Sequence, residues 1–160
     1  RCDDQFDAAI NPVNSIRYLT TDDDLINHLR LTAKNIKPGG LYIFESVYAF
    51  REKDSIYDES WSMDSPDGQL TMRWRLLEED HHHKKGREKS VLKIHHPDGQ
   101  KTIIRDIHTT RLWIYEDFLR LLERAGGWKL IAIHDHDFMP VVSETYFGEM
   151  GNLFHTLRRI

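Results

Sequence analysis

Residues 6–46, FDAAINPVNSIRYLTTDDDLINHLRLTAKNIKPGGLYIFES, contain the pattern that decides the fold. A short apolar strand (6–10) leads into a polar loop, an amphipathic helix and a second apolar strand (41–44). Both strands are continuously apolar, as is typical of strands covered on both faces in a parallel sheet. We therefore predict a strand–helix–strand unit of an open α/β sheet, in which ligands bind beyond the carboxyl ends of the strands.

The helix of this unit has clear start and stop signals. Thr21 is a candidate N-cap with Asp24 three residues later, and the aspartates at 22–24 favour the positive end of the helix dipole. Apolar residues then recur at helical spacing, namely Leu25, Ile26, Leu29, Ala33 and Ile36. Pro38-Gly39-Gly40 is expected to end the helix.

From about Arg51 the pattern changes to antiparallel β. Residues 51–66 are charged, aromatic and irregular, and alternating segments follow at 69–77, 90–96 and 101–113. We expect a loop at 78–88, and Pro97-Asp98-Gly99 is a hairpin signal. The alternation predicts an antiparallel β-meander with one solvent-exposed face. We interpret this meander as a lid or substrate insertion that covers the end of the main sheet.

The last third returns to α/β character. A helix is predicted over 115–125, followed by Gly126-Gly127, a strand over 128–133 and an edge strand over 151–160. We therefore expect core segments at 1–50 and 113–160, with the insertion at 51–112.

Composition narrows the classes of function. The 160 residues carry a net charge of -4 without a basic stripe, which argues against nucleic acid as the main partner. Cys2 is the single cysteine, so no internal disulfide can form, and no apolar run is long enough to span a membrane. We expect a cytoplasmic protein.

Four sequence segments, taken in their order along the chain, carry a resemblance to a known family. They are FDAAI (6–10) with Asn14-Ser15 and Tyr18-Leu19, the helix tail through KPGGL (29–41), RLWIYEDF (111–118) and LLERAG (121–126). Together they resemble the C-terminal portion of class I S-adenosylmethionine-dependent methyltransferases, most closely the glycine N-methyltransferase-like small-molecule branch. KPGG alone is moderately specific, and the ordered set is much more so.

This resemblance implies a partial Rossmann-like methyltransferase sheet. Residues 6–10 would be its fourth strand, 41–44 its fifth, Ala132 would fall in the sixth, and 151–160 would form the antiparallel seventh. The implied cofactor is S-adenosyl-L-methionine, and the implied reaction is methyl transfer to a nitrogen or oxygen of a small molecule. A homodimer is compatible with it.

The family's glycine-rich cofactor loop and the acidic residue after its second strand are not found in this sequence. We therefore expect a part of a longer protein that supplies the substrate-side half of the site and is inactive alone. The rival hypotheses are a non-catalytic methyltransferase-like binding or assembly module and a self-standing α+β ligand-binding domain.

Polar residues after the first strand are the main site candidates. The resemblance places this loop near the methionine end of the cofactor, which suggests Asn11, Asn14 and Tyr18 for cofactor binding and Ser15 for substrate. Asn14 and Glu45 are the catalytic candidates, because an amide can position a substrate and a strand-end carboxylate can act as a base. The alternative is that Asn14 and Ser15 only turn the chain and that Glu45 is solvated.

Further substrate contacts are predicted outside this loop. Tyr48 and Trp61 belong to an aromatic group that can wall a pocket, Arg75 can clamp a carboxylate, and His134 follows a core strand. Core packing and solvated strand positions are the alternatives. For Arg111 a structural salt link is expected. The contiguous His81-His82-His83 matches no metal-ligand spacing, so no metal site is predicted.

Overall fold

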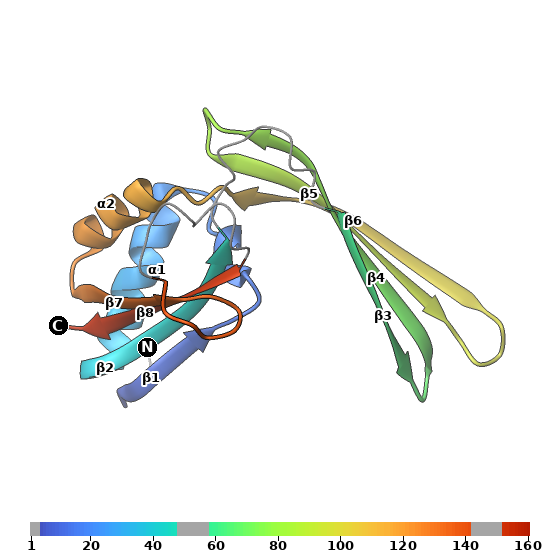
Figure 1. Ribbon diagram of the computed structural model, residues 1–160, viewed down its shortest axis with the longest axis horizontal. Helices are drawn as coiled ribbons and strands as arrows, with labels where there is room; N and C mark the ends of the chain where they lie inside the picture. The colour runs from blue at the N-terminus through green and yellow to red at the C-terminus, as the bar shows by residue number, and fades with distance from the viewer. Residues whose placement is uncertain (1–3, 48–57, 142–151) are drawn as a thin grey trace. The chain divides into compact units, whose positions relative to one another are not determined.

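The computed structural model describes residues 4–47, 58–141 and 152–160 (Figure 1). The chain divides into two compact units, one of residues 1–51 with 111–160 and one of residues 52–110. We call them the α/β unit and the β unit. Among the described residues, no helix is long and apolar enough to cross a membrane.

The elements follow one another in the order of the chain. The α/β unit contains β1 (Phe6–Asn11), the 3-10 helix η1 (Ser15–Tyr18), α1 (Asp22–Asn35), β2 (Ile36–Val47), α2 (Tyr115–Ala125), β7 (Trp128–His134) and β8 (Asn152–Arg159). The β unit contains β3 (Asp58–Ser65), β4 (Gly68–Asp80), β5 (Lys85–His95) and β6 (Lys101–Arg111), whose last residue lies at the boundary.

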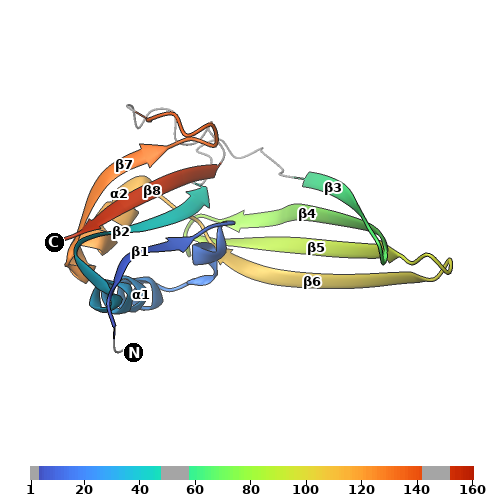
Figure 2. The ribbon, with the colours of Figure 1, turned by 90° about the horizontal axis from the view of Figure 1, so that it is seen from below.

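The sheet of the α/β unit has the strand order β1-β2-β8-β7 (Figures 1 and 2). β1 runs parallel to β2, with Ala8 opposite Leu41 and Asn11 opposite Phe44. This confirms the predicted parallel neighbours. β8 is antiparallel to both β2 and β7. Its antiparallel direction was expected, but its prediction as an edge strand was wrong, because it inserts between two other strands.

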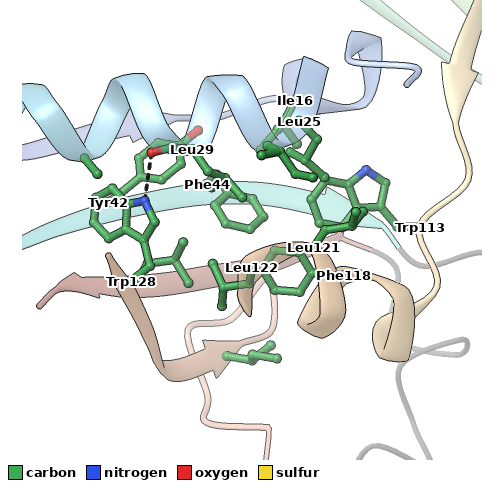
Figure 3. Packing of buried hydrophobic residues seen from close by; sticks show 14 of the residues in the cluster. Ile16, Leu25, Leu29, Tyr42, Phe44, Trp113, Phe118, Leu121, Leu122 and Trp128 are labelled. Atoms are coloured by element: carbon green, nitrogen blue, oxygen red, sulfur yellow. Dashed lines mark hydrogen bonds between the residues drawn. The ribbon is translucent and has the colours of Figure 1, made fainter. Parts of the chain in front are cut away.

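Two helices pack against one face of this sheet and enclose its core (Figure 3). Leu25 and Leu29 of α1 and Phe118 of α2 are buried against the aromatic rings of β2, Tyr42 and Phe44. The indole Nε1 of Trp128 donates a 2.9 Å hydrogen bond to the carbonyl oxygen of Leu29, which ties β7 to α1. The remaining predicted α1 residues, Ile26, Ala33 and Ile36, are also buried.

The start of α1 is as predicted, but its end is not. The Thr21 Oγ1 accepts a 3.1 Å hydrogen bond from the backbone N–H of Asp24, so Thr21 is the N-cap. The helix ends at Asn35, before Pro38-Gly39-Gly40, and these residues lie in β2. The chain is already extended here because Ile36 pairs with Phe6 of β1. A Cβ at Gly40 would approach the Asp7 carbonyl oxygen to 2.6 Å, so glycine permits this pairing.

β1 is less covered than its apolar sequence predicted. Phe6 is 50% and Ile10 73% exposed. β1 is the last strand of the described sheet and has one neighbour, and the helices pack on the face that carries Tyr42 and Phe44. The expectation of burial on both faces is therefore wrong for the residues described.

The β unit is an antiparallel sheet of order β3-β4-β5-β6. The predicted segments lie in β4, β5 and β6, whereas β3 falls in the stretch that the sequence suggested was irregular. The predicted loop at 78–88 is also wrong, because β4 continues to Asp80 and β5 begins at Lys85. Opposite charges face each other across this extension, Glu78 against Arg87 and Asp80 against Lys85, and such cross-strand pairs stabilise a solvent-exposed ladder.

Candidate functional site

The candidate site lies where β1 and β2 reach their carboxyl ends. Asn11, the last residue of β1, is opposite Phe44, and Glu45 follows directly on β2. Residues 12–14 connect β1 to η1 beside this end. In open α/β sheets this edge is where ligands bind, so the predicted polar residues lie in the expected place.

Glu45 holds this loop with one carboxylate oxygen and the start of β8 with the other. Its Oε2 accepts a 2.5 Å hydrogen bond from the backbone N–H of Val13, and its Oε1 accepts a 2.7 Å bond from the amide Nδ2 of Asn152. The Glu45 residue is 9% exposed. Bonds from donors to an ionised carboxylate are stronger than neutral ones, so Glu45 fixes the loop to the end of β2.

Asn14 is connected to the same group through Asn152. Its Nδ2 donates a 2.9 Å hydrogen bond to the Oδ1 of Asn152. Its own Oδ1 is buried and has no hydrogen-bond partner in the part of the chain that the structure describes. Val13 and Asn14 both have positive φ, 60° and 55°, a conformation that non-glycine residues adopt when the surroundings hold it.

Asn11 and Ser15 bond to each other across the loop. The Ser15 Oγ lies 2.5 Å from the Asn11 Oδ1 and 3.0 Å from the Pro12 carbonyl oxygen. The carbonyl oxygen of Asn14 accepts from the backbone N–H of Arg17, which starts η1. The structure therefore brings Asn11, Asn14, Ser15 and Glu45 together. Tyr18, at the end of η1, is 50% exposed.

The other predicted residues belong to other elements. His134 is the last residue of β7 and is opposite Phe154 of β8, which is opposite Glu45 on its other side, so His134 lies at the same sheet edge, two strands from Glu45. Trp61 and Arg75 belong to the β unit, on β3 and β4, and Tyr48 lies outside the described residues. The Asp58 carboxylate accepts two hydrogen bonds from Arg73 and lies 3.6 Å from the Nε of Arg75. A protein carboxylate thus already pairs with the predicted clamp.

Asn152 is the functional candidate that the sequence analysis missed. It starts β8 and is opposite Val47 in the ladder with β2. That register brings the Asn152 amide to Glu45. No local sequence pattern around position 152 predicts this contact. The signal would have been the pairing partner of β8, which local patterns do not give.

Arg111 has the structural role expected of it. It is buried, and its guanidinium forms an ion pair with Asp22 in the first turn of α1. The Arg111 carbonyl oxygen accepts from the Nε of Arg17 at 3.3 Å. These bonds fix the chain between the candidate site and the start of α1. Within the described ranges, no group of three or more histidine, cysteine or acidic residues is arranged to hold a metal ion.

No protein-family model matches the chain, and no curated protein matches it by sequence. Solved structures do match it. An S-adenosylmethionine-dependent methyltransferase from Clostridium acetobutylicum aligns with a TM-score of 0.76 at 14% identity, over 99% of this chain and 60% of that one. The sugar N-methyltransferase KedS8 from a Streptoalloteichus species aligns with 0.70 at 17%, over 100% and 59%.

A third match is CalS10, an amino pentose methyltransferase from Micromonospora echinaspora solved with S-adenosylmethionine bound, at a TM-score of 0.70 and 11% identity, over 100% of this chain and 61% of that one. The chain thus spans about three fifths of the length of the structures it matches. At these identities the likeness shows the fold: an α/β protein with a mixed sheet, shared with S-adenosylmethionine-dependent methyltransferases.

Proposed function

We propose that the protein transfers a methyl group from S-adenosylmethionine to a nitrogen or oxygen of a small molecule, and that this chain supplies the substrate-side half of the site. The observation that carries the proposal is the Glu45–Asn152–Asn14 network at the carboxyl ends of β1 and β2. It occupies the ligand-binding edge of a sheet whose fold is shared with methyltransferases.

S-adenosylmethionine, when bound, would supply a methyl group on a sulfonium sulfur: the acceptor lone pair forms the new bond to carbon, the sulfur–carbon bond breaks with its electron pair staying on sulfur, and the proton of the acceptor leaves to water. The chain's own contribution is positioning, which governs such in-line transfers. The buried Oδ1 of Asn14 is a carbonyl acceptor, so it fits an N–H or O–H donor. Asn11 precedes Asn14 and Tyr18 follows it in the sequence, and both are proposed cofactor contacts.

Glu45 contributes to this site as a positioning residue. Both of its oxygens accept hydrogen bonds from within the protein, so proton removal by Glu45 would require one of these bonds to break. The small-molecule contacts proposed for Ser15, Tyr48, Trp61, Arg75 and His134 stay predictions. We propose that this chain alone transfers no methyl groups.

The test compares cofactor binding and turnover in the whole protein. Titration calorimetry with S-adenosylmethionine and its demethylated product is expected to show binding, and a panel of small amines and alcohols is expected to yield a methylated product. Asn14→Ala should lower turnover about 100-fold, because misplaced reactants lose that much rate. Asn27→Ala on the exposed surface of α1 is the matched control. A protein that binds neither compound refutes the proposal.

An assembly role is the second candidate, and an apolar stripe on the β unit favours it. The stripe consists of residues that the registers place on one face of β3, β4 and β5: Trp61, Met63, Leu70, Met72, Leu92 and Ile94. Trp61 is 51% and Met63 57% exposed. We propose a second copy of the chain as its partner. Trp61→Glu should convert a dimer to a monomer in light scattering, and a wild-type monomer at high concentration argues against the role.

A further inference from the structure

We propose that Asn152 is a positioning residue that fixes the orientation of the Asn14 amide, so that Asn14 presents its carbonyl oxygen rather than its amino group at the end of β1. The inference deepens the proposed function, on which its assignment of that oxygen to a ligand rests. The orientation itself can be measured without a ligand.

The first step is the polarity of the network. A carboxylate has acceptor atoms alone, whereas an asparagine amide has one acceptor and one donor group. Glu45 Oε1 lies 2.7 Å from the Asn152 amide, so the group that faces it has to be the Nδ2 of Asn152. The Asn152 Oδ1 then faces Asn14 and accepts from its Nδ2 at 2.9 Å.

The second step is what this leaves on Asn14. With its Nδ2 committed to Asn152, the free end of the amide is Oδ1, which is buried and has no partner among the described residues. A buried carbonyl without a donor costs free energy, so this atom favours a ligand that brings an N–H or O–H. An amide turned by 180° would instead offer two N–H donors and favour a carboxylate.

The third step is why the arrangement holds. Glu45 is fixed independently by the 2.5 Å bond from the Val13 backbone to its other oxygen. Asn152 is fixed by the ladder of β8 with β2, where it is opposite Val47. The negative charge of Glu45 therefore orients the Asn152 amide, and the Asn152 amide in turn orients the Asn14 amide. Asn152 touches no reacting atom in this scheme and acts through Asn14.

The orientation is tested by NMR of the side-chain amides in the whole protein without added ligand. The Asn14 NH₂ protons are expected to exchange with water about tenfold more slowly than those of the exposed Asn27. Asn152→Ala should abolish that protection and leave the downfield Val13 backbone N–H signal in place, because the Val13 bond uses the other oxygen of Glu45. Unchanged Asn14 protection in Asn152→Ala overturns the proposal. Loss of the Val13 signal as well, which would mean collapse of the loop, also counts against it.

The consequence for the ligand is tested by kinetics. Asn152→Ala is expected to lower kcat/KM for an amine about tenfold or more, mainly through KM, and Asn152→Gln should restore part of it. Asn14→Ala combined with Asn152→Ala should be no worse than Asn14→Ala alone, because one acts through the other. Additive losses overturn the positioning role. If the wild-type protein methylates nothing, the proposed function fails while the NMR result still decides the orientation.

Discussion

Two of the three buried carboxylates among the described residues, one from each unit, have different kinds of partner. Glu88 is 3% exposed; its Oε2 accepts a 2.6 Å bond from the Trp74 indole and its Oε1 a 2.9 Å bond from the Thr110 hydroxyl. These partners lie on β4 and β6, the two strands beside β5. Glu45 is 9% exposed and holds a loop and the first residue of β8. Burial of a carboxylate alone therefore does not indicate a ligand site. Glu88 accepts from neighbouring strands of its own sheet, whereas Glu45 accepts from a loop and from the start of a strand.

The surroundings of the two carboxylates differ as well. Every buried hydrophobic residue of the described chain lies in the α/β unit, and the buried side chains of the β unit are those of Glu88 and Thr110. His108 also lies beside Glu88, with its Nε2 3.6 Å from Oε2 and its ring at an edge-on angle to Trp74. The buried part of the β unit is thus a polar cluster, whereas the buried part of the α/β unit is a packed hydrophobic core.

The largest effect is expected from removing Glu88. Glu88→Ala removes the carboxylate that accepts from the Trp74 indole and from the buried Thr110 hydroxyl, and two lost bonds to a charged group at about 2 kcal/mol each amount to about 4 kcal/mol. The free energy of unfolding of the β unit should fall by that amount in hydrogen exchange of β5 and β6 amides across a urea series. The exposed Glu78→Ala should change it by about 0.5 kcal/mol. If Glu88→Ala and Glu78→Ala lowered the free energy of unfolding equally, Glu88 would not be a structural carboxylate of the β unit, and its contrast with Glu45 would fail.

Acid should destabilise the α/β unit through His155. This ring is fully buried and stacks on Phe44 with centroids 4.6 Å apart. Burial lowers the pKa of His155 from 6.5 to about 4, so the folded unit keeps the ring neutral while the unfolded chain protonates it. Stability is therefore complete above pH 6.5 and falls as the pH drops towards 4, by on the order of 3 kcal/mol.

The measurement for His155 is the urea midpoint of the α/β unit at pH 7 and pH 4.5. His155→Leu removes the titrating group while keeping an apolar side chain, so its midpoint should change less between the two pH values than that of the wild type. An equal change in both proteins would assign the acid sensitivity to other groups.

Local sequence signals predicted the helices well and the long-range contacts poorly. Thr21 and the spacing of Leu25 and Leu29 are read within a few residues, and the structure reproduces them. β3 was missed because the Ser60–Met63 alternation lay in a charged stretch, although its pairing with β4 gives those residues an ordered place.

The candidate site was predictable in part for the same reason. Asn14 and Glu45 were found because each follows an apolar strand, and parallel strands bring their carboxyl ends together. Asn152 was missed because its contact spans 107 residues of sequence to Glu45 and depends on the position of β8 inside the sheet. The buried Glu88 was missed since it lies in a segment predicted as a loop from its charge.

A smaller effect on stability is expected for Glu45. Glu45→Ala removes one bond to a loop backbone and one to a partly exposed amide, which amounts to about 1–2 kcal/mol. Its effect should be concentrated in the loop, where the Val13 and Asn14 amides should lose protection while β5 stays unchanged. Hydrogen exchange of both units in one sample measures this. A loss as large as in Glu88→Ala would place Glu45 among the groups that hold a sheet together.

The smallest effect is expected at Thr21, which tests whether the site loop is held separately from the helix that follows it. Thr21→Ala removes the acceptor for the Asp24 backbone N–H, which costs about 1 kcal/mol, while Thr21→Ser keeps a hydroxyl and should cost less. Among the described residues, the Val13 backbone bonds to Glu45 and the Asn14 side chain bonds to Asn152. Asn14 side-chain protection should therefore stay unchanged in Thr21→Ala while the amides of the first α1 turn exchange faster. If the Asn14 side chain loses its exchange protection together with the first turn of α1, the loop conformation depends on α1 and not on the Glu45 carboxylate.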